Sequence, residues 1–387
     1  MSNSTKKRPD PSLRLTVLTA FVLALTGCAV VPLDGGVSGL QQLAESKAVG
    51  FGNAAVPIAR PGVDSTAAVN DLLKRPLTME AAVRIALMNN PAWQNSLASA
   101  GVGITDAMLA NSPAKLKAAQ DITLLSAEAR KAWVNAVAAA QTARNMAEAK
   151  EGAEAGGELA RRMTRVGNLS KLQQAREQAA LSDAAIQLAR AQQAAFSERE
   201  KLIVVMGLWG PQVSFELPGK LPDLPAQARD LPDIEAQVTK ERVDLRLAVT
   251  EWRRQLAAPP PSSADALWDA MRDSAKVREL AVKTRSEARQ VYNDYRTAYD
   301  LARHYQDEVV PLRKFITDEV VLRYNGMLLS VFDLLADTRA QVLSVNSAIE
   351  AQRDFWLAEA DLQTVLAGTS VGNSALSARG APTTAAQ

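Results

Sequence analysis

The sequence is poor in the residues that build disulfides, metal sites and catalytic centres. Its 387 residues include one cysteine, Cys28, and one histidine, His304. A lone thiol cannot form an internal disulfide, and one cysteine with one histidine leaves too few soft ligands for a zinc site. The sequence also has no Gly-rich phosphate loop and no evident pairing of a nucleophile with a base. We therefore expect no metal, no cofactor and no enzymatic activity.

Aromatic residues and an excess of charge of one sign are also scarce. Aromatics make up 5% of the chain, and 44 basic residues against 42 acidic ones leave a net charge of +2. This balance argues against a nucleic-acid-binding surface. Alanine, glutamine and arginine dominate the middle of the chain, a composition typical of long helices that pack through small side chains. We therefore predict a mostly α-helical fold.

The lone cysteine has an informative context near the N-terminus. Basic residues precede an apolar run from Leu15 to Leu25, which has the length of a secretory signal and is too short to span a bilayer. The segment Leu25 to Cys28 resembles the bacterial lipobox, in which a signal peptidase cuts before a cysteine that carries lipid. We expect residues 1–27 to be a lipoprotein signal peptide and Cys28 to carry acyl chains as a durable anchor. Ala29 follows instead of aspartate, which by analogy sorts the protein to the outer membrane. The alternative is a buried structural cysteine.

The mature chain begins with few periodic residues and continues with long helices. Residues 28–75 contain several Gly and Pro and predict an extended tether from the lipid. Thr78 is a candidate N-cap for a first helix. Two long runs, from about Leu124 to Arg165 and from Leu169 to Met206, flank a glycine turn and predict an antiparallel hairpin of about 60 Å. A Pro-rich connector follows over 211–230, with a short strand expected near 213–217.

The second part of the chain repeats the plan of the first. The interval from Ser170 to Gly207 is 37 residues and that from Ser330 to Gly368 is 38. Each interval begins after a glycine turn and ends where a helix stops. We predict a tandem duplication, with a first helical repeat over 76–210, a second over 231–368 and a disordered tail over 369–387. Each repeat needs the other to bury its helical face.

Together these segments resemble the TolC-type outer-membrane efflux proteins, in their lipid-anchored branch. The resemblance covers most of residues 76 to 368 and rests on "PLTMEAAVRIALMNNP", "GELARRMTRVGNLSKLQQAREQAALSDA", the "LPDLP" connector and the "LRYNGMLLSVFDLLADTRAQV" segment. It implies a homotrimer whose long helices form a periplasmic tunnel. It also implies two protein partners, a periplasmic adaptor and an inner-membrane efflux pump.

The sequence departs from the family pattern where barrel strands would lie. A transmembrane strand needs about 9–11 residues of alternating apolar and polar character. Residues 108–125 and 255–280 show no such alternation, and residues 259–261 are three consecutive prolines. We expect a TolC-like periplasmic α-barrel with little or no β-barrel, with lipid as the membrane attachment. The chain is either a natural shortened member or an edited chain that keeps the tunnel helices.

The two predicted turns are the first candidate site. The resemblance implies that they form periplasmic tips that bind the adaptor. We expect Gly167 and Gly326 to supply left-handed turn conformations, and Leu169, Met327 and Leu328 to be exposed. Either Asn168 or Ser170 should cap the second helix. The alternative is that both are ordinary helix turns. The candidate residues are Val166, Gly167, Asn168, Leu169 and Ser170 in the first tip, and Asn325, Gly326, Met327, Leu328, Leu329 and Ser330 in the second.

The second candidate site is a pair of carboxylates. Asp333 and Asp337 are spaced i, i+4 directly after the second tip and should share one helix face. Threefold symmetry would turn them into acidic rings at a tunnel entrance that favours cations. The alternative is a solvated face balanced by Arg339. His304, near Asp307 and Glu308, indicates a helical surface cluster.

Two functions remain open on this sequence. The first is the outer-membrane component of a tripartite efflux system, exporting metal ions or small toxic molecules through a trimeric helical tunnel. The second is a periplasmic scaffold lipoprotein that binds the adaptor and conducts nothing.

Overall fold

The computed structural model describes residues 65–372, with gaps at 101–112 and 258–263. The residues in these ranges form helices and no β-strand. Cys28, the predicted signal peptide, most of the tether and most of the tail lie outside the described residues. The elements, in chain order, are α3 (Thr66–Leu73), α4 (Met79–Asn89), α5 (Pro91–Ala100), α6 (Pro113–Arg165), α7 (Lys171–Met206), η2 (Gly210–Val213), α8 (Ile234–Glu241), α9 (Val243–Leu256), α10 (Ala264–His304), η3 (Tyr305–Val309), α11 (Val310–Asn325) and α12 (Val331–Leu366).

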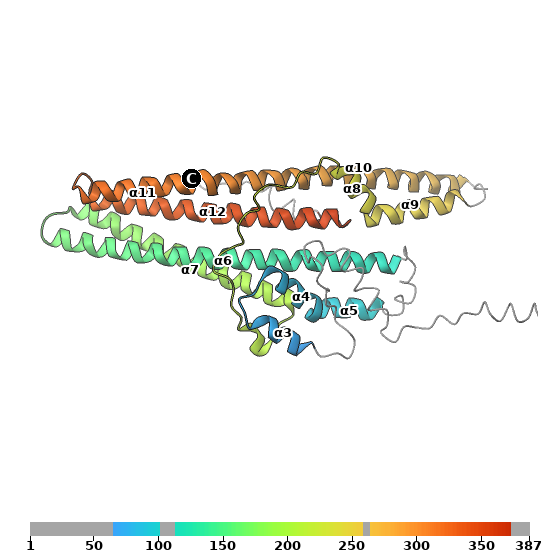
Figure 1. Cartoon of the computed structure of the whole chain (residues 1–387), viewed down its shortest axis with the longest axis horizontal. Helices are drawn as coiled ribbons and strands as arrows, with labels where there is room; N and C mark the ends of the chain where they lie inside the picture. Colours follow the sequence, from blue (N-terminus) through green and yellow to red (C-terminus); the bar gives the residue numbers. More distant parts are fainter. Residues whose placement is uncertain (1–64, 101–112, 258–263, 373–387) are drawn as a thin grey trace, which may run out of the picture.

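Two long hairpins determine the shape of the molecule. Helices α6 and α7 form the first, and α10, α11 and α12 form the second, with all of them running along the long axis (Figure 1). The short helices α4 and α5 lie against the first hairpin, and α3 packs on α4. Both hairpin turns lie at the same end of the molecule. The prediction of a mostly α-helical fold with duplicated antiparallel hairpins is confirmed.

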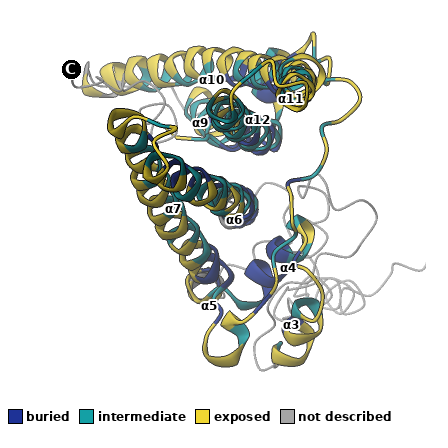
Figure 2. Cartoon of the chain, turned by 90° about the vertical axis from the view of Figure 1, so that its left-hand side faces the viewer, coloured by how far each residue is buried: buried dark blue, intermediate teal, exposed yellow. Residues whose placement is uncertain are grey.

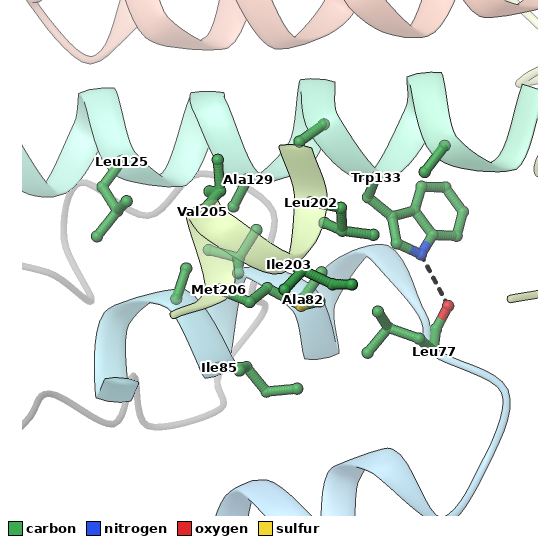
Figure 3. Close-up of a cluster of buried hydrophobic side chains, with 14 of the residues drawn as sticks. Leu77, Ala82, Ile85, Leu125, Ala129, Trp133, Leu202, Ile203, Val205 and Met206 are labelled. Atoms are coloured by element: carbon green, nitrogen blue, oxygen red, sulfur yellow. Dashed lines mark hydrogen bonds between the residues drawn. The ribbon is translucent and has the colours of Figure 1, made fainter. Parts of the chain in front are cut away.

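The first hydrophobic core lies where α4 meets the open end of the first hairpin. Figure 3 shows Ala82 from α4, Ala129 and Trp133 from α6, and Leu202 and Met206 from α7 gathered where the three helices meet. Thr78 caps α4 as predicted, because its hydroxyl accepts a hydrogen bond from the Ala81 N–H. That cap holds the start of α4 beside α6, where its apolar face is buried.

The second hydrophobic core, between α10 and α12, contains several of the chain's few aromatic residues. Tyr295 and Tyr299 of α10 pack against Phe355 of α12, with ring centroids 5.7 and 5.6 Å from it. The two tyrosine hydroxyls also bind the connector: Tyr295 accepts a hydrogen bond from the Arg229 N–H at 2.9 Å, and Tyr299 donates to the Pro225 carbonyl at 3.0 Å. Each ring therefore fills the core while its polar end fixes a segment with little backbone pairing of its own.

Helices α6 and α12 join the two halves in an antiparallel seam. Lys131 pairs with Asp361, and the Asn145 side chain donates to the Asn346 side chain at 2.7 Å. A step of 14 residues along α6 (Lys131 to Asn145) matches 15 along α12 (Asn346 to Asp361). Farther along, a Cβ on Gly156 of α6 would lie 2.8 Å from a methyl carbon of Leu335. The seam is therefore regular and close along most of both helices.

The C-termini of α7 and α12 show the duplication in atomic detail. Both helices are 36 residues long and are followed by a glycine with positive φ: Gly207, at 66°, comes directly after α7, and Gly368, at 86°, follows Ala367 at the end of α12. Each glycine lies against the end of the short helix of its own half. An added Cβ would be 2.5 Å from the Asn89 carbonyl oxygen at Gly207 and 2.1 Å from the Glu241 carbonyl oxygen at Gly368. Both positions therefore require glycine for conformation and for space.

The strand expected near 213–217 is not formed. The chain makes a short 3₁₀ helix, Gly210–Val213, with Pro211 at its start, and continues without regular structure. One backbone hydrogen bond ties it to the first half, from the Leu77 N–H to the Glu216 carbonyl at 2.8 Å. The Arg199 guanidinium of α7 also donates to the Val213 and Phe215 carbonyls, at 3.0 and 2.6 Å. A side chain and one backbone hydrogen bond therefore occupy the polar groups that a strand ladder would have used.

We expect Gly368→Ala to lower the free energy of unfolding by more than the ~1–2 kcal/mol that a left-handed conformation costs a non-glycine residue, because its Cβ also meets the Glu241 carbonyl. Urea unfolding followed by circular dichroism measures the loss. Gly152→Ala in α6 is the matched control, since an added Cβ there meets nothing within 4 Å. It should stabilise the helix by up to about 1 kcal/mol. Equal stability of Gly368→Ala and the wild type would contradict this account.

Candidate functional site: the two hairpin tips

The first tip closes with a standard helix C-terminal motif. Helix α6 ends at Arg165, and Gly167 takes a left-handed conformation with φ of 79°. The Asn168 N–H reaches back to the Met163 carbonyl at 2.9 Å, which satisfies a carbonyl that the helix leaves open. Ser170 then caps α7, because its hydroxyl accepts from the Gln173 N–H at 3.2 Å. Of the two candidate caps, Ser170 takes the role, and the prediction for Gly167 is confirmed.

The second tip has the same geometry but a different residue at the strained position. Gly326 has φ of −78°, so the prediction that it supplies the left-handed conformation is wrong. Met327 takes that conformation instead, with φ of 59°. Its neighbour Leu328 donates to the Arg323 carbonyl at 2.9 Å, which reproduces the bond made by Asn168 in the first tip. Met327 therefore corresponds to Gly167, because the distance from the helix end decides which residue must be left-handed.

Three large apolar side chains stand out from the tips. The exposed fractions are 69% for Val166, 93% for Met327 and 77% for Leu328. Leu169, which the sequence suggested as a third exposed residue, is half-buried, and so is Leu329. The exposed apolar set of the tips is therefore Val166, Met327 and Leu328. Asn168 and Asn325 are exposed polar neighbours in the same turns.

Asp333 caps its own helix. Its carboxylate accepts hydrogen bonds from the Ser330 N–H at 3.0 Å and from the Ser330 hydroxyl at 2.8 Å, while Ser330 accepts from the Asp333 N–H. This reciprocal arrangement is a capping box. The hydrogen bonds from Ser330 lower the pKa of the Asp333 carboxyl. Asp333 is therefore held in its ionised form at the start of α12.

Asp337 points into the second hairpin. Its carboxylate pairs with the Arg313 guanidinium at 2.9 Å and accepts from the Thr317 hydroxyl at 2.6 Å, both on α11. Arg339 does not balance it as the alternative reading expected, because Arg339 pairs with Glu177 on α7. The two carboxylates thus have different partners within the chain. Their predicted role at a tunnel entrance stays a prediction.

The contacts of Arg313, Arg339 and Glu177 were missed by sequence reasoning. Arg339 and Glu177 are 162 positions apart, and their pairing joins α12 of the second hairpin to α7 of the first. Both tips therefore lie close together at one end, as Figure 1 shows. The spacing of residues along one helix carries no signal for a contact between two helices so distant in sequence.

The described residues hold no cluster of three or more His, Cys, Asp or Glu side chains suited to a metal ion. The Nδ1 atom of His304 lies 3.3 Å from the Oε2 atom of Glu308, and both side chains are exposed. None of the described helices is long and apolar enough to cross a membrane.

Solved structures of known proteins resemble this chain, although its sequence matches no described family. No family model matches the chain, and no curated protein matches it either. Solved structures do match. The outer-membrane channel OprN aligns with a TM-score of 0.53 and 16% identity over 74% of this chain and 72% of its own. The outer membrane protein VceC from Vibrio cholerae aligns with a TM-score of 0.53 and 13% identity over 72% of this chain and 77% of its own. The CmeC outer membrane channel from Campylobacter jejuni aligns with a TM-score of 0.52 and 12% identity over 72% of this chain and 68% of its own.

The chain has the fold of TolC-type outer-membrane channels. At these identities the likeness shows the fold alone. Within this TolC-type fold, the two tips are the turns of the long hairpins.

Substitutions at the two tip glycines should differ in their effect on stability. We expect Gly167→Ala to lower the free energy of unfolding by about 1–2 kcal/mol, because alanine resists a left-handed conformation. Gly326→Ala should be tolerated, since its φ is negative and the nearest atoms to an added Cβ are 3.5 Å away or more. Met327→Gly should relieve strain and raise stability. Chemical unfolding of the three variants checks these values, and similar losses for Gly167→Ala and Gly326→Ala would refute the assignment of the strained positions.

Proposed function

We propose that this protein is the outer-membrane component of a tripartite efflux system and that its two tips bind a periplasmic adaptor. The observation that carries the proposal is the pair of tips, which lie together at one end of a TolC-type fold and expose Val166, Met327 and Leu328. A solvated turn would gain nothing from apolar residues, whereas the desolvated centre of an interface would. Its structural neighbours are described as outer membrane channels.

A homotrimer fits the exposed faces of the hairpins. Helix α7 turns an exposed side away from the rest of the chain (Figure 2). Large apolar side chains are exposed at well-separated positions along α7, where a neighbouring copy would cover them: Leu172, Ile186, Phe196 and Val204. Repetition of this contact around a threefold axis would close a helical tunnel.

The proposed cargo is metal ions or small toxic molecules delivered by an inner-membrane pump. In a trimer, Asp333 and Asp337 would recur three times near the tip end of that tunnel. Asp333 is exposed and, like any ordinary aspartate, charged at neutral pH, which supports a cation-favouring entrance, whereas the charge of Asp337 is paired with Arg313. The proposed location is the outer membrane, with the protein facing the periplasm and anchored through lipid on Cys28.

The adaptor contact can be tested with one substitution on each tip. We expect Val166→Asp combined with Leu328→Asp to weaken the adaptor complex by on the order of 2 kcal/mol or more, because charge enters the proposed apolar contact. The measurement is co-purification with a periplasmic adaptor protein that is co-expressed with this chain.

Val282→Asp is the matched control, since Val282 is 67% exposed and lies on α10 away from the tips. It should leave adaptor binding unchanged. Thermal unfolding of every variant separates lost binding from lost folding. Adaptor binding that survives in the double variant would show that the tips are ordinary turns.

Conductance separates the efflux component from the scaffold alternative. The protein extracted from membranes should give discrete conductance steps in planar lipid bilayers if it forms a pore. Silence over many preparations, with the helical circular dichroism spectrum intact and the adaptor still bound, would instead support a non-conducting scaffold lipoprotein.

A further inference from the structure

Exposed apolar side chains lie at the end of the molecule opposite the tips. Helix α9 ends there and helix α10 begins there (Figure 1). Four large side chains at these helix ends are exposed, by 64% for Leu256, 55% for Leu267, 60% for Trp268 and 55% for Met271. We call these four residues the α9–α10 surface.

The outward orientation of this surface is set by a polar contact behind it. The Gln255 amide of α9 donates to the Asp273 carboxylate of α10 at 2.5 Å, so that side of α10 faces α9. Leu267, Trp268 and Met271 lie on another side of the helix, at spacings of one and four residues. The first turns of α10 are therefore amphipathic, with a polar side toward the protein and an apolar side toward the surroundings.

The exposed apolar residues of the α9–α10 surface differ in arrangement and in type from those on α7. Those positions are spread along the helix, as a lateral contact with another long helix requires. The α9–α10 surface instead gathers a tryptophan with aliphatic and thioether side chains at the ends of two helices. Tryptophan is enriched where a protein meets the boundary between lipid headgroups and acyl chains, because its ring is apolar and its N–H is polar.

The charges around this surface are balanced. Residues 251–276 contain four acidic and four basic side chains. Several of them pair locally, with Glu251 2.7 Å from Arg254 and Asp269 2.9 Å from Arg272. A net-neutral, paired rim gains little from an anionic surface but matches zwitterionic headgroups, which also carry both signs.

We propose that the α9–α10 surface contacts a zwitterionic lipid leaflet end-on, with Trp268 at the level of the headgroups. It is a second membrane contact beside the lipid predicted on Cys28. Lipid joined to the protein through the predicted tether of residues 28–75 leaves the molecule free to tilt, whereas a contact at the start of α10 would hold its axis upright. The inference rests on the proposed function in one respect, since that function directs the tips toward the adaptor and the opposite end toward the outer membrane.

Fluorescence quenching tests the contact directly. Full-length protein extracted from membranes is reconstituted into vesicles of phosphatidylethanolamine and phosphatidylcholine that carry bromine near the headgroup end of the acyl chains. Bromine quenches tryptophans that touch lipid. Of the six tryptophans in the chain, Trp268 and Trp209 are the exposed ones in the described residues. We expect Trp268→Phe to lose most of the quenching seen in the wild type.

Trp209→Phe is the matched control, because Trp209 is 78% exposed but lies beside α3 and not at the end of the molecule. It should keep the wild-type quenching. Equal quenching in the wild type and in Trp268→Phe would overturn the proposal. So would a change of oligomeric mass in Leu267→Asp with Met271→Asp, measured by light scattering in detergent, because the surface would then be a contact between copies. Adaptor co-purification is measured separately. If Trp268 is quenched by lipid but the protein does not bind the adaptor, the membrane contact stands and the proposed efflux function is rejected.

Discussion

The antiparallel contact between α6 and α12 is the constraint on which the rest of the structure depends. Each hairpin can bury only part of its surface within itself, because two helices leave broad faces uncovered. Small residues such as Ala129 and Ala136, both fully buried, let α6 approach its neighbours closely. The regular α6–α12 contact then extends from the first core toward the tips. Both turns consequently reach the same end of the molecule.

Buried charges specify the register of that seam more than they stabilise it. Glu359 of α12 is buried and pairs with Arg229 of the connector at 3.0 Å, and Lys131 of α6 pairs with Asp361. Burial raises the pKa of Glu359 and lowers the pKa of Arg130 nearby. Each ion loses part of its hydration on burial, and only the opposite charge of its partner offsets that loss. A slip of α6 along α12 would separate Lys131 from Asp361, which makes the observed alignment the favoured one.

The two tips show how one backbone frame can be built from unlike sequences. Gly167 and Met327 occupy the same left-handed position, and Ser170 and Ser330 both cap the helix that follows. Methionine is a costly choice at that position, since positive φ is unfavourable for a side chain with a Cβ. The choice places an apolar side chain at the outermost point of the tip. A strained residue retained at an exposed turn agrees with a role in binding.

Much of this architecture was predictable from local patterns. The long proline-free runs, the cap at Thr78, the turn at Gly167 and the matched intervals ending at Gly207 and Gly368 all depend on residues close together in sequence. Local chemistry decides helix starts, helix ends and hairpin turns, so the sequence by itself determined a mostly α-helical, duplicated chain. The tertiary structure alone decided which side chains are exposed and which are paired. It placed Leu169 half-buried, moved the strained conformation from Gly326 to Met327 and joined Arg339 to Glu177. These outcomes depend on how distant helices rotate and align against one another, which the periodicity of one helix does not record.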